Sequence, residues 1–298
     1  MSKAGQSLLA RVFRGSSRSV FDLAMDRALL DRLATPGVHE KQISHFLGED
    51  GLRFVASEPL FAKPLVILAF TNRSGSTLLA EYMRQSGMFH GLGEFANHDF
   101  VKKQMRERRL DTFPGLIKSL AGSAGARQLF GLKASWDQIA MLARWNIPAM
   151  FTGIRIVRIS RHDMLAQAIS YSIAEQTRQW TSTQQASGQD PVFNAHDIDR
   201  IIREQQLHDA LIRLVAQALG APSYGVIYEG LCANPTPHMR EILAYCGVPR
   251  PHWVPEEPKL KKQAGPVNQA FRAAYLELAR ERMLGSPTTS AEGPGESA

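Results

Sequence analysis

One apolar run and two further strand candidates stand out after the first sixty residues of the chain. Residues 64–71 form a continuous run, which begins at a proline and is followed by polar residues, and residues 154–160 and 224–228 are two shorter strand candidates. An apolar run of this length is typical of a strand that is buried on both faces, as in a parallel sheet. We therefore predict three strands.

Segments with apolar residues at helical spacing follow the strands. Helices are predicted from residue 78 onward and over residues 164–176, 201–219 and 239–246. Short apolar strands that alternate with longer helices predict an α/β fold, in which a mainly parallel central sheet is flanked by helices. The helix over residues 201–219 is expected to serve core packing.

The chain is predicted to contain one α/β domain with an extension at each end. Residues 1–60 are expected to form a helical, basic extension, with helical spacing over residues 20–52 that is interrupted by Pro36 and Gly37. Residues 61–284 form the domain. Residues 285–298 are rich in serine, threonine, proline and glycine, which predicts a disordered tail.

Composition narrows the class of protein. No apolar run approaches the roughly 20 residues that a transmembrane helix needs, and the basic first 21 residues lack the apolar core of a secretory leader. A cytoplasmic protein is expected, although a basic start also suits a packed arm, a transit peptide or a weak membrane-surface helix. The two cysteines and nine histidines show no metal-ligand spacing, so we expect neither a metal site nor a disulfide.

The net charge points to an anionic partner. Lysine and arginine number 35 against 28 acidic residues, which gives a formal charge of +7. The basic residues are spread along the chain and aromatic residues make up only 8%, so no stacking platform for nucleic acid stands out. A small phosphorylated or sulfated ligand fits this distribution better.

A polar turn joins the first predicted strand to its helix. At such a junction the free main-chain N–H groups and the positive end of the helix dipole favour an anion. Gly75 lets the backbone approach the anion, Arg73 adds charge, and hydroxyls come from Ser74, Ser76 and Thr77. The alternative interpretation is a simple turn and helix cap.

The nucleotide-binding pattern GxxxxGK[ST] is not met by this turn. With Gly75 as its second glycine, Phe70 occupies the first glycine position and Ser76 the lysine position. A kinase or another NTP-dependent phosphotransferase is therefore an alternative function that the turn argues against. A nucleotide-binding protein without catalytic activity is a further alternative.

The turn over residues 73–79 resembles the phosphosulfate-binding loop of sulfotransferases that use 3′-phosphoadenosine-5′-phosphosulfate (PAPS). That superfamily also uses an arginine at a strand end and a serine on the following helix, and Arg161 and Ser170 occupy such positions. Residues 161–163, 167–170 and 176–180 are similar to the bacterial trehalose 2-sulfotransferase-like family. The resemblance covers about residues 63 to 280.

The resemblance implies a P-loop-like fold of three layers and a PAPS-dependent sulfotransferase that needs no metal. Arg73 and the loop through Thr77 would hold the phosphosulfate, while Arg161 and Ser170 would bind the 3′-phosphate. Lys262 and Gln263 would close over the nucleotide, although the neighbouring lysines also suit a solvated basic face.

For the acceptor, the resemblance implies that Glu94 is the catalytic base. Residues 91–95 are expected to form a loop that returns to the carboxyl edge of the sheet, and His98 is the alternative base. Lys133, Trp136 and Trp180 are candidates for the lining of the acceptor site, with ordinary packing as the alternative for the two tryptophans. Residues 228–229 are expected to be structural.

The acceptor would carry a hydroxyl group, on a carbohydrate or glycolipid in the first instance. Residues next to Glu94, namely Gly93 and Ala96, depart from the trehalose-modifying pattern, so the sequence does not single out trehalose. The resemblance also allows a homodimer.

Overall fold

The computed structural model describes residues 29–180, 190–258 and 265–285. The chain divides into two compact units, residues 1–36 and residues 37–298. The first contains the described helix α2 (Leu29–Ala34), and the second contains every other described element. Lys262, Gln263, the basic arm before residue 29 and the tail from residue 286 lie outside the described residues.

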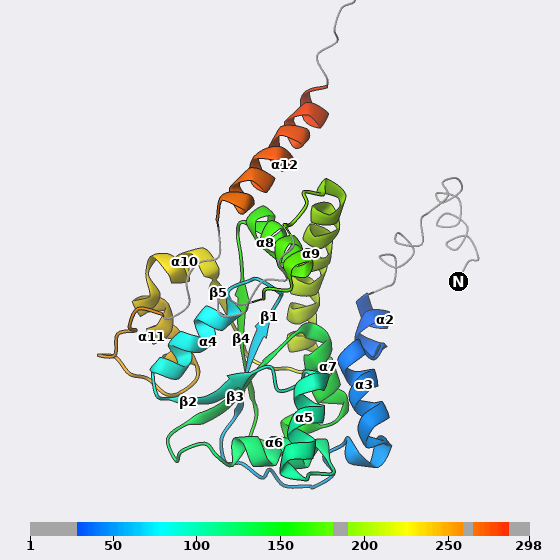
Figure 1. The fold of residues 1–298 in the computed structure, drawn as a ribbon. Coiled ribbons are helices and arrows are strands. Elements are labelled where there is room, and N and C mark those ends of the chain that lie inside the picture. Colours follow the sequence, from blue (N-terminus) through cyan, green and yellow to red (C-terminus); the bar gives the residue numbers. More distant parts are fainter. Residues whose placement is uncertain (1–28, 181–189, 259–264, 286–298) are drawn as a thin grey trace, which may run out of the picture. The chain divides into compact units, whose positions relative to one another are not determined.

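A five-stranded, fully parallel sheet forms the centre of the second unit (Figure 1). Its spatial order is β2-β3-β1-β4-β5. The strands are β1 (Leu65–Phe70), β2 (Phe89–Gly93), β3 (Leu129–Ala134), β4 (Ile154–Ser160) and β5 (Ser223–Ile227). The predicted α/β fold is confirmed. The three predicted strands are also confirmed, and they correspond to β1, β4 and β5.

Two strands escaped prediction because their sequences interrupt the apolar pattern. Glycines lie inside both β2 and β3, and β3 also carries Lys133, although every residue of that strand is buried. The prediction of a loop over residues 91–95 is wrong for its first part, since β2 continues to Gly93. Pairing with β3 stabilises this glycine-containing segment as an edge strand.

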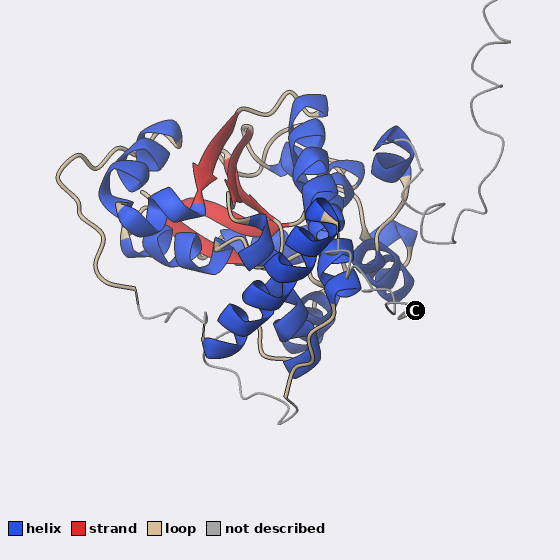
Figure 2. Cartoon of the chain, turned by 90° about the horizontal axis from the view of Figure 1, so that it is seen from above, coloured by secondary structure: helices blue, strands red, loops and turns tan. Residues whose placement is uncertain are grey.

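Helices cover both faces of the sheet (Figure 2). One face packs against α4 (Ser76–Gln85), α10 (Tyr228–Ala233) and α11 (Pro235–Tyr245), with Val66 and Leu68 of β1 in their shared apolar core. The other face carries α7 (Trp136–Arg144) and α9 (Ala195–Ala218). Because side chains alternate along a strand, β1 supplies both cores, which explains its unbroken apolar sequence.

The remaining helices lie around these layers. They are α3 (Val38–Leu47), α5 (His98–Arg108), α6 (Phe113–Ala121), α8 (Met164–Thr177), α12 (Pro266–Leu284) and the short η1 (Glu49–Gly51) and η2 (Ile147–Met150). Helix α8 packs on α9 and α12, and α3 packs on α5 and α7. The predictions of α8, α9 and α11 are confirmed, although α9 begins six residues earlier than expected, where Asn194 caps it by accepting from Asp197 N.

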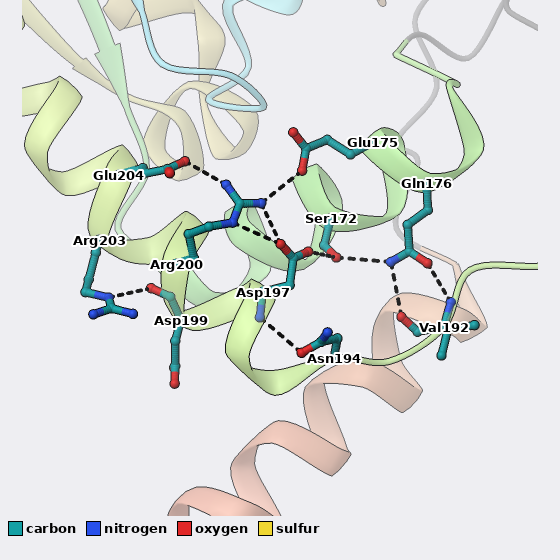
Figure 3. A network of polar contacts seen from close by, with 10 residues as sticks. All are labelled: Ser172, Glu175, Gln176, Val192, Asn194, Asp197, Asp199, Arg200, Arg203 and Glu204. Carbon is teal, nitrogen blue, oxygen red and sulfur yellow. Dashed lines mark hydrogen bonds and ion pairs between the residues drawn. The ribbon is translucent and has the colours of Figure 1, made fainter. Parts of the chain in front are cut away.

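A network of polar side chains joins α8 to the start of α9 (Figure 3). Arg200 of α9 contacts Glu175 of α8 at 3.2 Å and Glu204 at 2.9 Å, and it also pairs with Asp197. Ser172 of α8 donates to the other carboxylate oxygen of Asp197 at 2.8 Å. This network fixes α8, the helix that carries Ser170, against α9.

No helix within the described ranges is both long and apolar enough to cross a membrane. Both Cys232 and Cys246 are free thiols.

Candidate active site

The carboxyl edge of the sheet brings together side chains from all five strands. The connection that leaves β1 leads to β2 on one side, whereas the connection that leaves the neighbouring β4 leads to β5 on the other side, so the connections after these two adjacent strands run in opposite directions. Ligands of open α/β sheets bind at such a switch point. In spatial order the edge carries Glu94 after β2, Lys133 in β3, residues 71–75 after β1, Arg161 after β4 and Tyr228 after β5.

The turn after β1 has a left-handed backbone at two of its residues. Arg73 has a φ of 62° and Gly75 a φ of 95°, and Gly75 is the N-cap of α4. A Cβ on Gly75 would lie 2.2 Å from ring atom Cδ2 of Tyr228. Glycine is therefore required both by the backbone conformation and by the aromatic ring that packs on the turn.

The hydroxyl groups of the turn differ in their surroundings. Ser74 is fully buried, and its Oγ has no hydrogen-bond partner among the described residues. Ser76 is buried at the first position of α4, and Thr77 follows it. A buried, unpartnered hydroxyl beside free N–H groups at a helix N-terminus suits an anion, so the predicted phosphate site fits the chain's own residues.

Arg73, Arg161 and Ser170, which the sequence places far apart, come together beside this turn. Arg73 Nε donates to Ser170 Oγ at 2.9 Å, and its Nη1 donates to the carbonyl of Trp180 at 2.5 Å. Arg161 Nη1 donates to the carbonyl of Arg73 at 3.4 Å. Burial and, after it, the positive charge of Arg161 lower the pKa of Arg73. An anion placed here would relieve the repulsion between two guanidinium groups.

Tyr228 and Glu229 hold Arg161 in place. The Arg161 guanidinium lies 4.4 Å from the centroid of the Tyr228 ring, and its Nε lies 3.4 Å from Glu229 Oε1. Glu229 also accepts from the main-chain N–H groups of His162 (3.1 Å) and Asp163 (3.4 Å). Burial raises the pKa of Glu229, but these N–H groups and Arg161 outweigh it, so the pKa is lowered.

These two residues were expected to be only structural, and their contact with Arg161 was missed. Their position directly after a strand of the sheet was the available signal. Burial and a hydrogen bond to Cys232 raise the pKa of Tyr228 to about 12, so its ring meets Arg161 as a neutral phenol. A neutral ring face attracts a guanidinium through its quadrupole.

Lys133 links the turn to Glu94. Its residue exposure is 6%, and its Nζ lies 2.8 Å from Glu94 Oε1, 3.4 Å from Thr77 Oγ1 and 4.8 Å from the centroid of the Phe70 ring. The Glu94 side chain is 47% exposed. A buried ammonium therefore lies between the helix that begins at the turn and a carboxylate that solutes can reach.

His98 pairs with His39 of α3. The two Nδ1 atoms lie 2.7 Å apart, and His39 Nδ1 also accepts from the main-chain N–H of His98 at 3.2 Å. An atom that accepts an N–H carries no proton of its own, so the proton between the rings belongs to His98 Nδ1. His98 Nε2 lies 3.6 Å from Asp99 Oδ1.

The two tryptophans pack against rings on different helices. Trp136 begins α7, and its half-buried ring lies 6.1 Å from the ring of His208 on α9. Trp180 follows α8, and its ring lies 5.5 Å from that of Tyr171. Within the described part of the chain, no three His, Cys, Asp or Glu side chains are grouped so as to hold a metal ion.

We expect Gly75→Ala to lower the free energy of unfolding by about 1–3 kcal/mol, because it combines a strained left-handed residue with a clash against Tyr228. Gly153→Ala is the matched control: an added Cβ meets nothing within 4 Å there, and an effect within about 0.5 kcal/mol is expected. Urea unfolding of the three proteins measures the difference. Equal effects of the two substitutions would contradict this account of the turn.

Stability should also depend on pH through His39. Burial lowers its pKa below the usual 6.5, with His98 adding to this effect, while the carboxylates of Asp137, Glu94 and Asp99 oppose it. Because the folded state favours the neutral ring, the stability contributed by His39 is present above about pH 6.5 and is lost as the pH falls through the lowered pKa.

Unfolding at a series of pH values tests this in His39→Asn. The free-energy difference between wild type and the variant should shrink between pH 7.5 and 5. His45→Asn, on the exposed side of the same helix, should change with pH as wild type does. If the free-energy difference between wild type and His39→Asn stays constant over this pH range, His39 does not have the lowered pKa assigned to it.

Comparison with known proteins identifies the family of the chain. The sequence model of the Stf0 sulphotransferase family matches residues 65–277, more than two thirds of the chain, whereas no curated protein matches.

Among solved structures, the chain is similar to a sulfotransferase from Alicyclobacillus acidocaldarius, with 12% identity, a TM-score of 0.43 and coverage of 77% of this chain and 96% of that one. It is similar to the sulfotransferase domain of the Synechococcus PCC 7002 olefin synthase at 16% identity and a TM-score of 0.40, over 78% and 98% of the two chains. A third similar structure is the sulfotransferase domain from the curacin biosynthetic pathway, with 16% identity, a TM-score of 0.38 and coverage of 70% of this chain and 82% of that one. The family match confirms the resemblance seen in the sequence: this chain belongs to the Stf0 sulfotransferases.

Proposed function

We propose that this sulfotransferase transfers a sulfuryl group from PAPS to a hydroxyl group of a carbohydrate or glycolipid. The convergence of Arg73, Ser170 and Arg161 at the turn after β1 carries the proposal. Ser170 and Arg161 lie 97 and 88 positions after Arg73 in the chain, so their contacts with Arg73 depend on the fold rather than on local sequence. A ligand with two separate anionic groups suits two arginines that are held by different partners.

For the donor, the residues divide between the two anionic groups. The main-chain N–H groups of the turn, Arg73 and the hydroxyls of Ser74, Ser76 and Thr77 would hold the phosphosulfate. Arg161 and Ser170 would hold the 3′-phosphate, with charge-assisted hydrogen bonds worth about 1.5–3 kcal/mol each. Lys262 and Gln263 remain proposed nucleotide contacts outside the described residues.

PAPS supplies a sulfuryl group attached to a phosphate, which is the leaving group. The protein's task is to align the acceptor hydroxyl and to stabilise negative charge on the leaving oxygen. Lys133 is suited to the second task because its buried Nζ contacts both Glu94 and Thr77 of the turn's helix. Arg73 adds a second positive charge at the same edge.

Glu94 is proposed as the base that accepts the proton of the acceptor hydroxyl. Lys133 contacts its Oε1, and the carboxylate has a second oxygen that can take the proton. We favour it over His98 because Lys133 connects it directly to the turn, whereas the ring nitrogens of His98 face His39 and Asp99. The acceptor would approach from the half-exposed side of Glu94.

The two tryptophans are proposed to border a carbohydrate acceptor. Trp136 offers a half-buried ring at the N-terminus of α7, directly after the strand that carries Lys133. The apolar face of a sugar ring packs well on an indole, whose N–H remains available for a hydroxyl group. Trp180 is proposed to border the acceptor from the other side, where its carbonyl holds Arg73.

Calorimetry with adenosine 3′,5′-bisphosphate, the spent donor, tests the donor site. Wild type should bind it at micromolar strength and bind ATP with magnesium poorly. Arg161→Ala should weaken binding tenfold or more, which corresponds to about 1.4 kcal/mol. Arg213→Ala, with a side chain that is 60% exposed on α9, is the control and should bind like wild type. Strong ATP binding together with no effect of Arg161→Ala would favour a phosphotransferase or a binding protein instead.

Glu94→Gln tests the base. With the hydroxyl's proton acceptor removed, kcat should fall by about 10²–10⁴-fold while the bisphosphate still binds. Glu107→Gln, a half-exposed glutamate of α5, should keep full activity. If Glu94→Gln remains active and His98→Asn does not, the base is His98.

A further inference from the structure

The carbonyl of Asn72, directly before the left-handed Arg73, accepts hydrogen bonds from two glutamine side chains. Gln167 Nε2 of α8 donates to it at 2.8 Å, and Gln205 Nε2 of α9 donates to it at 3.2 Å. Gln167 Nε2 also donates to Thr71 Oγ1 at 2.9 Å. Two helices therefore hold one peptide group of the turn.

Holding this carbonyl also orients the N–H of Arg73. A trans peptide unit is planar, and its C=O and N–H point in opposite directions. With the Asn72 carbonyl directed at the two glutamines, the Arg73 N–H must point away from them. The carbonyl on the other side of Arg73 accepts from Arg161. The peptide groups on both sides of the strained residue are thus held by side chains.

The orientation of the Gln205 amide leaves its own oxygen without a hydrogen-bond partner among the described residues. The residue is 6% exposed, and its Oε1 is buried with no hydrogen-bond partner in the described part of the chain. Turning the amide over would place Oε1 against the Asn72 carbonyl, which repels it. A buried acceptor without a partner lowers stability, and an apolar side chain of similar size would avoid that loss. Core packing alone, the role expected for this helix, does not explain a glutamine here.

We propose that Gln205 is a positioning residue of the donor site: with Gln167 it clamps the peptide between residues 72 and 73, so that the turn is shaped for an anion before the anion arrives. This inference rests on the proposed function. Preorganisation of this kind raises affinity because the ligand does not have to order the loop. Both clamping groups are neutral amides, so they add no negative charge beside the anion.

Gln205→Leu separates positioning from packing. The variant should bind adenosine 3′,5′-bisphosphate 5- to 30-fold more weakly, and its KM for PAPS should rise more than its KM for the acceptor. Its midpoint of thermal unfolding should stay equal to that of wild type or increase, because the unpartnered oxygen is gone. A packing residue would instead lose stability along with affinity. Gln206→Leu, the exposed neighbour on α9, is the matched control and should bind like wild type.

Gln205→Glu gives a second measurement with nearly the same side-chain size. An ionised carboxylate cannot donate to the Asn72 carbonyl, whereas a protonated one can. Relative to wild type at the same pH, the affinity of this variant for the bisphosphate should therefore be low at pH 8 and should recover as the pH is lowered toward 5.

The outcomes distinguish this inference from the proposed function. Failure of the wild-type protein to bind the bisphosphate would overturn both. If wild type binds the bisphosphate and Gln205→Leu binds it with an affinity within twofold of wild type, the clamp alone is overturned. The same holds if the affinity of Gln205→Leu falls only together with its midpoint of thermal unfolding. A Gln205→Glu variant whose relative affinity does not change with pH would also overturn it.

Discussion

The left-handed backbone of Arg73 is the constraint on which the rest of the site depends. A non-glycine residue keeps such a conformation only where its surroundings over-determine it. Here they do: α8 and α9 hold the carbonyl before it, Arg161 at the end of β4 holds the carbonyl after it, and Ser170 holds its side chain. The strand order places β4 and β3 on either side of β1, so the turn receives these contacts from one side and Lys133 from the other.

Three cationic side chains are gathered at this edge of the sheet. Arg161 and Lys133 each face one carboxylate, Glu229 and Glu94 respectively, while Arg73 faces a hydroxyl and a carbonyl. The carboxylates fix the positions of two cations without enclosing them, and both acidic side chains are more than a third exposed. A ligand with two anionic groups could therefore be attracted by all three cations, while Glu229 and Glu94 keep Arg161 and Lys133 in place.

Sequence reasoning succeeded where the signal was local. The unbroken apolar strand and the polar turn could be recognised without coordinates, because each is a short pattern. The resemblance supplied the pair Arg161 and Ser170, whose role as a phosphate site stays a prediction. Strands β2 and β3 could not be recognised, since their glycines and the buried Lys133 resemble loop residues until the neighbouring strands supply hydrogen bonds. The contact of Gln205 with Asn72 spans 133 positions, and no periodicity along the chain predicts it.

The ring of Tyr228 over Gly75 has a consequence for how the protein is made. Contacts that complete the turn come from residues as late as 228 and 229, far along the chain from the turn itself. Such distant contacts form late in folding, because the chain must first close long loops. During synthesis, β1 and α4 leave the ribosome long before the residues that shape their junction. A nascent chain that lacks β5 and α10 would therefore contain the sequence of the turn but not the contacts that shape it.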